Sequence, residues 1–294
     1  MYKKSIKEVS NYLIPFIQGI KYYGSNEIEH CLGTMIILNK NGDILTCRHI
    51  AEQFILNNQL NDKYFKVISE IKSIKNSENK KKLEKKYNLN NDTIVLSNIF
   101  LPFKVNGDFK INIIFHEYLD LAIIRFNDVK FDIGNYPIFS KNIPLQGQSV
   151  CKLGYAFPEY SIYEYSDKTN NIVIKKNIVS NFPLFPLDGI VTRHVMDDNK
   201  KLSMFETSTP GLRGQSGGPI FDTDGLVYGI QSMTRQIDLN FDVNGTVKRG
   251  INKKNVEFTP FINLGIGISS SEIIKFLEDN NIDFDCKLVR IYSL

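Results

Sequence analysis

The sequence predicts an all-β protein built mainly from antiparallel strands. Short segments rich in Ile, Val, Phe and Tyr recur along most of the chain, and turns of Asn, Asp, Gly and Lys separate them. Strands have this length and composition. The stretch NKNGD, from Asn39 to Asp43, is a hairpin-turn signal between two of these segments. The predicted strands are GTMIIL (33–38), GDILTC (42–47), TIVLSNIF (93–100), KINIIF (110–115), DLAIIRF (120–126), SVCKLGYAF (149–157), NIVIKK (171–176), DGIVTRHV (188–195), PIFD (219–222), GLVYGIQS (225–232) and NLGIGIS (263–269).

Helical periodicity interrupts this pattern at three places. Residues 6–13 are expected to form a short lead-in helix, and SSSEIIKFLEDNN (269–281) begins with serine caps and predicts a late helix. Between them, residues 62–87 combine nine lysines and four acids with apolar residues at helical spacing. We therefore expect a basic helical insertion over about 60–90. Its apolar positions are Tyr64, Val67, Ile68, Ile71 and Ile74.

The charge and the cysteine content indicate which partners and which cellular compartment to expect. The 36 Lys and Arg against 32 Asp and Glu give a net charge of +4, which predicts no general attraction to nucleic acid or to a membrane. Polar residues interrupt the apolar stretch of the first twenty residues, so we expect no signal peptide. The four cysteines have neither CxxC nor zinc-like spacing. A cytoplasmic protein with reduced thiols, no metal and no cofactor is the expectation.

The stretch GLRGQSGGPIFD (211–222) surrounds one serine with glycines and a proline. When an acyl carbonyl is attacked, its oxygen becomes negative and needs two backbone N–H donors aimed at one point. Gly214 leaves the approach clear, and the N–H groups of Gly214 and Ser216 could face one oxygen. The alternative is a glycine-rich β-turn without chemistry. A serine hydroxyl alone is a poor nucleophile, so the catalytic interpretation also requires a base and a group that orients it.

His49 and Asp120 are the candidates for these two roles. His49 lies in GDILTCRHIAEQF, where a strand ends and a short helix is expected to begin. Asp120 immediately precedes a strand that is expected to be buried, and a buried carboxylate needs a partner such as a histidine N–H. Considered singly, each residue is better explained as structural.

In this order, His49, Asp120 and Ser216 resemble the chymotrypsin-like (trypsin-like, S1-type) serine peptidases. CLGTMIIL and GDILTCRHIA resemble the first barrel of that family, DLAII the segment with its aspartate, and GQSGGP its nucleophile motif. VCKLGYAFP and LGIGISSSEIIKFL resemble the second barrel, most closely in the bacterial HtrA-like branch without its peptide-binding module. The resemblance implies two six-stranded β-barrels, over residues 1–135 and 136–294, that together form one peptidase unit.

The same resemblance implies a set of substrate-binding positions. Ser232 would support the aspartate, and the backbone of Met233 and Thr234 would pair with an extended peptide. The S1 pocket would be lined by Pro210, Gly211, Gln231, Thr234 and residues 263–265, without an acid at its base. A preference for Lys or Arg at P1 is therefore not expected. Gln231 and Thr234 would favour a polar or small P1 side chain, and Arg213 would favour acidic residues nearby.

Two departures from the family concern activation and redox state. Cys31 stands at a family disulfide position, but Ile50 occupies the place of its partner, so that bridge cannot form. Gln215 stands where digestive members carry an aspartate that pairs with a new N-terminal ammonium. Activation by trimming of the N-terminus is therefore not expected.

The sequence leaves three functions open. The first is an active intracellular serine endopeptidase with a protein or peptide substrate, and the second is a catalytically silent trypsin-like fold that acts as a protein-binding module. The third, nucleic-acid binding through the lysines of residues 60–90, is the weakest. Those lysines are explained either as a solvated helix face or as a docking arm for an acidic regulatory partner.

Overall fold

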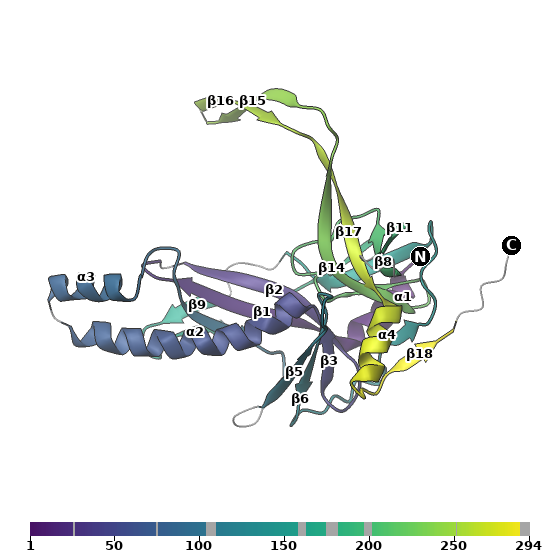
Figure 1. Ribbon diagram of the computed structural model, residues 1–294, viewed down its shortest axis with the longest axis horizontal. Helices are drawn as coiled ribbons and strands as arrows, with labels where there is room; N and C mark the ends of the chain where they lie inside the picture. The colour runs from purple at the N-terminus through teal and green to yellow at the C-terminus, as the bar shows by residue number, and fades with distance from the viewer. Residues whose placement is uncertain are drawn as a thin grey trace.

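Two large β-sheets form the body of the protein, and a helical projection and a long β-hairpin extend from it (Figure 1). The predicted all-β, mainly antiparallel class is confirmed. The computed structural model describes residues 1–25, 27–74, 76–103, 110–157, 163–174, 182–196, 202–250 and 252–288.

The first sheet has six antiparallel strands in the order β4-β1-β2-β3-β6-β5. Among the described strands, its end strands β4 and β5 do not pair with each other, so the sheet is a half-barrel. All four residues of β3 are buried, and the chain leaves it directly toward His49. The strands are β1 (Leu13–Tyr22), β2 (Ile28–Ile37), β3 (Asp43–Thr46), β4 (Ile94–Phe100), β5 (Ile111–Phe115) and β6 (Ala122–Phe126).

The second sheet closes into a barrel. Its order is β13-β8-β11-β12-β17-β14, and β14 pairs back with β13, which completes a ring of six antiparallel strands. β7 and β18 extend the sheet beyond β14 by parallel pairing. The strands are β7 (Ile138–Ser140), β8 (Ser149–Tyr155), β11 (Leu184–Met196), β12 (Leu202–Thr207), β13 (Pro219–Phe221), β14 (Val227–Asp238), β17 (Phe261–Ser269) and β18 (Asp285–Lys287).

A small hairpin lies beside the first sheet. It consists of β9 (Tyr163–Ser166) and β10 (Asn171–Ile174), and Tyr163 and Ile172 pack against Ile17 of β1. The last two residues of the strand predicted over 171–176 lie outside the described residues.

One apolar core joins the two sheets. It contains Phe16 and Ile123 from the first sheet, Leu153 and Ile230 from the second, and Leu277 from the C-terminal helix. Full burial of each such side chain contributes about 1.5–3 kcal/mol. The two sheets are therefore held in a fixed relation, which a site built from both requires.

The ends of the chain carry short helices. The helix predicted over 6–13 begins earlier, as α1 (Lys3–Val9), and continues as one 3₁₀ turn, η1 (Ser10–Tyr12). The late helix is α4 (Ser270–Asp279), as the sequence predicts. β1 follows η1 directly and lies outside the strands that the sequence predicts. Its Pro15 lies opposite Thr34 of β2, before the stretch from Ile17 onward in which β1 also pairs with β4.

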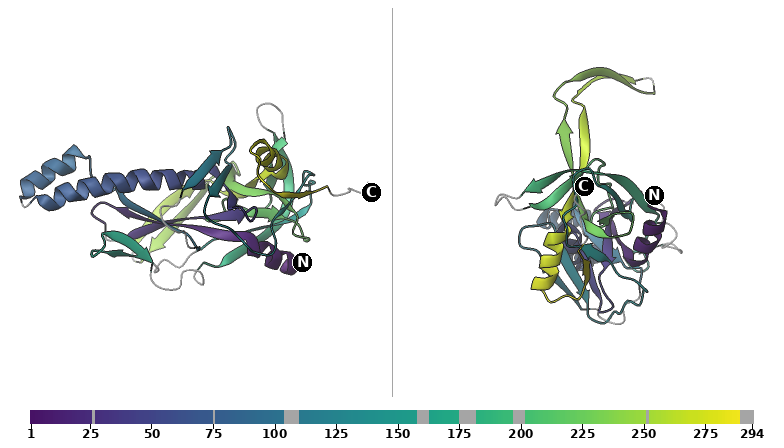
Figure 2. Two further views of the ribbon diagram at one scale, coloured as in Figure 1. Left: turned by 90° about the horizontal axis from the view of Figure 1, so that it is seen from below. Right: turned by 90° about the vertical axis from the view of Figure 1, so that its right-hand side faces the viewer.

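The helix that starts beside His49 is much longer than expected. The sequence predicts a short helix there and a separate one over 62–87, but α2 (Arg48–Ser73) is continuous, because no Gly or Pro interrupts it. α3 (Ser77–Lys86) then folds back beside it and carries the exposed lysines of the insertion (Figure 2). Of the predicted apolar positions, Val67 is buried, whereas the side chains of Tyr64 and Ile68 lie outside the described part of the chain.

The β-hairpin that extends from the second barrel was not predicted. β14 and β17 continue beyond the barrel, and β15 (Val243–Arg249) and β16 (Asn252–Phe258) prolong them into an arm over residues 238–261 (Figures 1 and 2). Several large apolar side chains are exposed along it, including Leu239, Phe241 and Phe258.

No helix in the described part of the chain has the length and apolar character that crossing a bilayer demands.

Candidate active site

His49 and Asp120 lie together at the edge of the first sheet. His49 is in the first turn of α2, and Asp120 ends the loop that joins β5 to β6. The His49 Nδ1 atom lies 3.0 Å and 2.9 Å from the two carboxylate oxygens of Asp120. The His49 backbone N–H also donates to Asp120 Oδ1, at 3.0 Å. Because the first N–H groups of a helix lack partners within it, Asp120 caps α2 and orients the His49 ring at the same time.

Asp120 receives a further hydrogen bond from the second barrel. Ser232, in β14, donates its hydroxyl to Asp120 Oδ2 at 2.7 Å. Burial by itself would raise the pKa of Asp120. The hydrogen bonds from the His49 ring, from Ser232 and from the His49 backbone outweigh it, so the pKa of Asp120 is lowered. The carboxylate is therefore charged at neutral pH and poised to hold one His49 tautomer.

Ser216 lies in the loop between β12 and β13, close to the same network. Its hydroxyl donates to the Ser232 carbonyl oxygen at 3.3 Å. In this structure it makes no hydrogen bond to His49, although both residues are described. The three predicted residues are thus brought together through Ser232, with the serine hydroxyl turned to a backbone oxygen. A hydrogen bond between a catalytic serine and its histidine is often long or unformed without substrate, and it tightens when substrate binds.

Gly214 and Gly217 shape the loop around Ser216. Both have positive φ, +98° and +85°. A Cβ on Gly214 would overlap the Tyr155 carbonyl oxygen, and one on Gly217 would overlap the Thr34 carbonyl oxygen. Within the described residues, the N–H groups of Gly214 and Ser216 donate to no acceptor. These two donors are therefore available to a bound oxyanion.

Thr34, which is not among the site residues predicted from the sequence, attaches this loop to the first sheet. Its side chain is fully buried in β2. The Thr34 hydroxyl donates to the Gly214 carbonyl oxygen at 2.7 Å and accepts from the Tyr155 N–H at 3.1 Å. The Thr34 backbone N–H donates to the Ser216 carbonyl oxygen at 2.8 Å. A buried threonine in an apolar strand gives no sequence signal for this role.

The residues expected to contact substrate lie at the start of the exposed part of β14. Met233 and Thr234 are exposed, whereas Gln231 and Ser232 are buried. Thr234 Oγ1 donates to the Gly211 carbonyl oxygen at 2.7 Å, and Gln231 Nε2 donates to the Met233 carbonyl oxygen at 2.7 Å. The segment of Pro210 and Gly211 is therefore held directly against β14.

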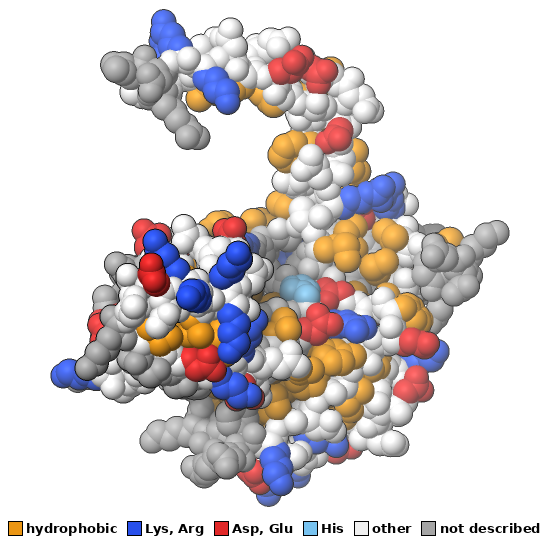
Figure 3. Space-filling model, turned by 60° about the vertical axis from the view of Figure 1, so that its left-hand side comes forward, with side chains coloured by type: hydrophobic (Ala, Val, Ile, Leu, Met, Phe, Trp, Pro, Cys, Tyr) orange, Lys and Arg blue, Asp and Glu red, His pale blue; other side chains and the backbone are white. Residues whose placement is uncertain are grey.

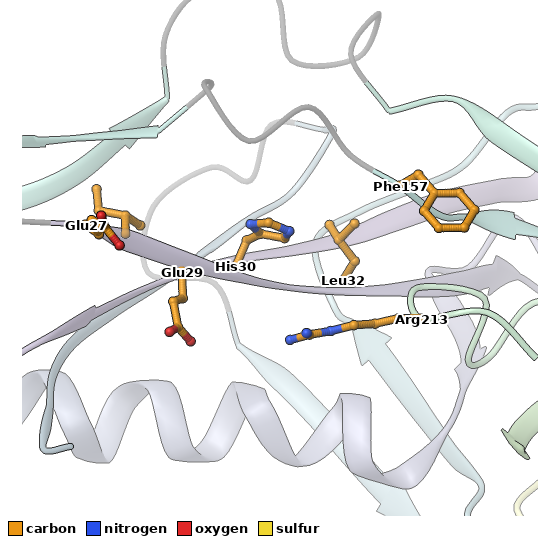
Figure 4. A pocket seen from close by; sticks show the side chains of 7 residues that line it. Glu27, Glu29, His30, Leu32, Phe157 and Arg213 are labelled. Carbon is orange, nitrogen blue, oxygen red and sulfur yellow. The ribbon is translucent and has the colours of Figure 1, made fainter. Parts of the chain in front are cut away.

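Arg213 extends from the nucleophile loop to a pocket of about 480 Å³ on β2. Figure 4 shows Arg213 and Glu29 on one side of this strand and His30 on the other. Burial, and next the charge of Arg213, lower the pKa of His30. A hollow in the surface between the lysine-bearing helices and the arm also exposes a histidine side chain (Figure 3). The His49 side chain is 49% exposed, so the imidazole is accessible to a ligand.

Cys47 is the only thiol in the described residues that joins a cluster with metal-ligand character. Its Sγ and one ligand atom each of His49 and Asp120 lie within 4.8 Å of one another. Burial is the largest of the effects that raise the pKa of the Cys47 thiol well above its ordinary value. Because the thiolate is the form that binds metals, and His49 and Asp120 bind each other, this cluster is poorly suited to hold an ion.

The comparison with protein families places these residues in one domain type. A family model described as a trypsin-like peptidase domain matches residues 33–230, about two thirds of the chain. The match includes His49, Asp120 and Ser216, together with the lysine-rich insertion. The search of curated proteins found no match.

Proposed function

The chain belongs to the trypsin-like peptidase family, and from this premise we propose that it is a serine endopeptidase that uses His49, Asp120 and Ser216. In the proposed reaction, His49 Nε2 accepts the proton of Ser216 as the serine Oγ attacks the peptide carbonyl carbon. The N–H groups of Gly214 and Ser216 stabilise the oxygen that becomes negative. His49 then gives the proton to the leaving amine. In the second half of the reaction, His49 accepts a proton from the water that attacks the acyl-enzyme and returns it to Ser216 Oγ as the acyl bond breaks.

The hydrogen bonds of the Asp120 carboxylate are the main observation that supports this proposal. The carboxylate accepts hydrogen bonds from the His49 ring and backbone and from Ser232, so residues of both sheets converge on one charged group. A carboxylate in this position fixes the imidazole with Nε2 free to accept a proton and stabilises the cation that forms. We propose accordingly that the two sheets, over residues 1–135 and 136–294, act as one peptidase unit.

One observation favours a second candidate, a catalytically silent fold that binds proteins. The Ser216 hydroxyl donates to the Ser232 carbonyl oxygen and not to His49. In a silent protein this arrangement would persist with peptide bound. In an active one, a small rotation of the serine side chain would bring its hydroxyl to His49 when substrate displaces water.

Digestion of a proteome-derived peptide library separates the two candidates. The wild-type protein is expected to generate new termini, and the Ser216→Ala variant is expected to generate almost none, with a loss of roughly 10⁴-fold or more in rate. The Ser10→Ala variant is the matched control, because Ser10 only donates to the Lys7 carbonyl oxygen near the N-terminus. Equal cleavage by wild type and Ser216→Ala would remove Ser216 from the mechanism. Absence of cleavage by wild type would favour the binding module.

We also propose a reducing, cytoplasmic setting, protein or peptide substrates, and a regulatory partner for the lysines of α3. All four cysteines are free, and burial is the largest cause that raises the thiol pKa of Cys31, Cys47 and Cys151. Neutral thiols without disulfide partners are typical of proteins in a reducing compartment. The lysines that would bind an acidic partner are Lys80, Lys81, Lys82, Lys85 and Lys86.

A further inference from the structure

Lys152 is a buried cation that the proposed mechanism does not use. It lies in β8 of the second barrel, and its side chain is 1% exposed. Its Nζ donates to Thr207 Oγ1 at 3.1 Å and to the Pro210 carbonyl oxygen at 2.8 Å, and also to the Thr209 carbonyl oxygen. All three N–H donors of the ammonium therefore have partners, and all three partners are neutral.

No carboxylate in the described part of the chain forms an ion pair with Lys152. Glu206, on the neighbouring strand β12, is bound instead to Arg193 at 2.8 Å and to Thr192 at 2.9 Å. Asp188 of β11 lies opposite Cys151, the residue before the lysine. A buried charge without a counter-ion is costly, so the ammonium is paired only by oxygen dipoles.

This cation lies directly behind the segment that contacts the substrate-binding part of β14. Pro210, whose carbonyl oxygen binds Lys152, is followed by Gly211, whose carbonyl oxygen accepts from Thr234. Gly265 of β17 makes room for the ammonium, because a Cβ at that position would stand 2.7 Å from Lys152 Nζ. Pro210, Gly211, Thr234 and Gly265 are all positions that the family resemblance assigns to the S1 pocket. The buried ammonium therefore lies behind the residues to which the resemblance assigns the S1 pocket.

We propose that Lys152 is a specificity-determining residue that selects an acidic side chain, Glu or Asp, at the P1 position of the substrate. This inference rests on the proposed function and names its substrate class. An acidic P1 side chain brings the negative charge that the buried ammonium lacks, whereas a Lys or Arg side chain would add a second positive charge. Specificity is a difference between two such interactions, and a repulsive element contributes as much as an attractive one.

The pH dependence of the preference follows from the surroundings of Lys152. Burial lowers the pKa of Lys152 to about 7, and the Cys151 thiol opposes this change. The neighbouring elements present a hydroxyl from Thr207 and two carbonyl oxygens, none of which titrates near neutrality. Lys152 is therefore charged below this pH and increasingly neutral above it. Selection of an acidic P1 residue should be strong near pH 6 and weak near pH 9.

Two peptides that differ only in Glu or Gln at P1 test this inference. For wild type at pH 6, the ratio of kcat/KM for Glu over Gln is expected to be about 10-fold or more, a common size for one charge interaction in a site. In Lys152→Met the ratio should fall to about one, while cleavage of the Gln peptide is retained. Lys275→Met, which replaces an exposed lysine of α4, is the control and should keep the wild-type ratio.

The outcomes separate this inference from the proposed function. An unchanged ratio in Lys152→Met, or a wild-type preference for Gln, Lys or Arg at P1, would overturn it while leaving the peptidase intact. Failure of a fluorophosphonate to label Ser216 would instead remove the peptidase proposal. Should Lys152→Met not fold, the wild-type ratio between pH 6 and 9 decides alone, since a ratio independent of pH contradicts a role for Lys152.

Discussion

At the scale of single residues, Ser232 is the contact that joins Asp120 to the second barrel. Its hydroxyl donates to Asp120 Oδ2 at 2.7 Å and is one of the hydrogen bonds that lower the carboxylate pKa. Ser232→Ala should therefore raise the pKa of Asp120 and loosen the His49 ring. We expect kcat to fall about 10-fold, which corresponds to one hydrogen bond to a charged group.

The pH profile distinguishes this positioning role from a loss of folding. A carboxylate whose folded pKa is lowered stabilises the protein above its unfolded pKa of about 3.9 and loses that contribution as pH falls through the folded value. In Ser232→Ala, the stability that depends on ionisation of Asp120 should be smaller than in wild type, and its loss should be complete at a higher pH, because the folded pKa lies closer to the unfolded one. If Ser232→Ala had the kcat of wild type and the same dependence of stability on pH in the acidic range, the Ser232 contact would be dispensable.

Gly214 gives a second residue-scale prediction. Its φ is +98°, and a Cβ there would overlap the Tyr155 carbonyl oxygen. Gly214→Ala should displace the N–H groups beside Ser216 and cost about 1–3 kcal/mol of stability from backbone strain alone. Urea unfolding measures the stability, and Gly245→Ala is the control, because that glycine has open space around it and no positive φ. Equal stability of the two variants would contradict the close fit of the loop.

Some residues of the site could be predicted from the sequence and others could not. Ser216 lies in a glycine-rich string that indicates chemistry by itself, whereas His49 and Asp120 gain a catalytic interpretation only together with it. The structure brings the three residues into one hydrogen-bond network through Ser232. Thr34 and Lys152 lie inside apolar strands, where nothing in the local sequence indicates that a hydroxyl or an ammonium turns inward. Their partners are distant along the chain, so only the folded structure identifies them.

At the scale of elements, α2 protects the edge of the first sheet. The Asn61 side chain donates to the Ser97 carbonyl oxygen at 2.7 Å and accepts from its N–H at 3.1 Å, as a neighbouring strand would. Asn61→Ala should therefore destabilise the protein by about 1–2 kcal/mol, because two backbone groups of β4 lose their partner. Chemical unfolding measures this, with Asn79→Ala on exposed α3 as the control. A loss no larger than that of the control would mean that water replaces Asn61 without cost.

The elements also show where the sequence signals fail. Strands with alternating or continuous apolar character, such as β3 and β6, are predicted because burial dictates their composition. The arm over 238–261 contacts little of the core, so burial does not select apolar residues for its strands. Their sequences mix polar, charged and apolar residues, as the sequence of a loop does. The sequence predicts two helices where α2 is one, because the mostly polar stretch NNQLND (57–62) interrupts the apolar periodicity between them.

At the scale of the whole molecule, the site depends on contact between the two sheets. Thr34 of the half-barrel binds Gly214, Ser216 and Tyr155 of the closed barrel. Thr34→Val keeps the shape but removes the hydroxyl, so two buried backbone groups lose a partner. We expect a loss of about 1–3 kcal/mol in stability and a larger effect on kcat than on KM. Thr246→Val on the exposed arm is the matched control. Unaltered kcat in Thr34→Val would show that the loop holds its shape without the half-barrel.

The central claim, that Ser216 is a nucleophile activated by His49, is tested most directly by reaction with a fluorophosphonate. Intact mass and peptide mapping should show one adduct on Ser216 of the wild-type protein. The adduct should be absent from Ser216→Ala and strongly reduced in His49→Ala, while Ser10→Ala should be labelled as wild type. A folded wild-type protein that gains no adduct, or an adduct that persists in Ser216→Ala, would contradict the account.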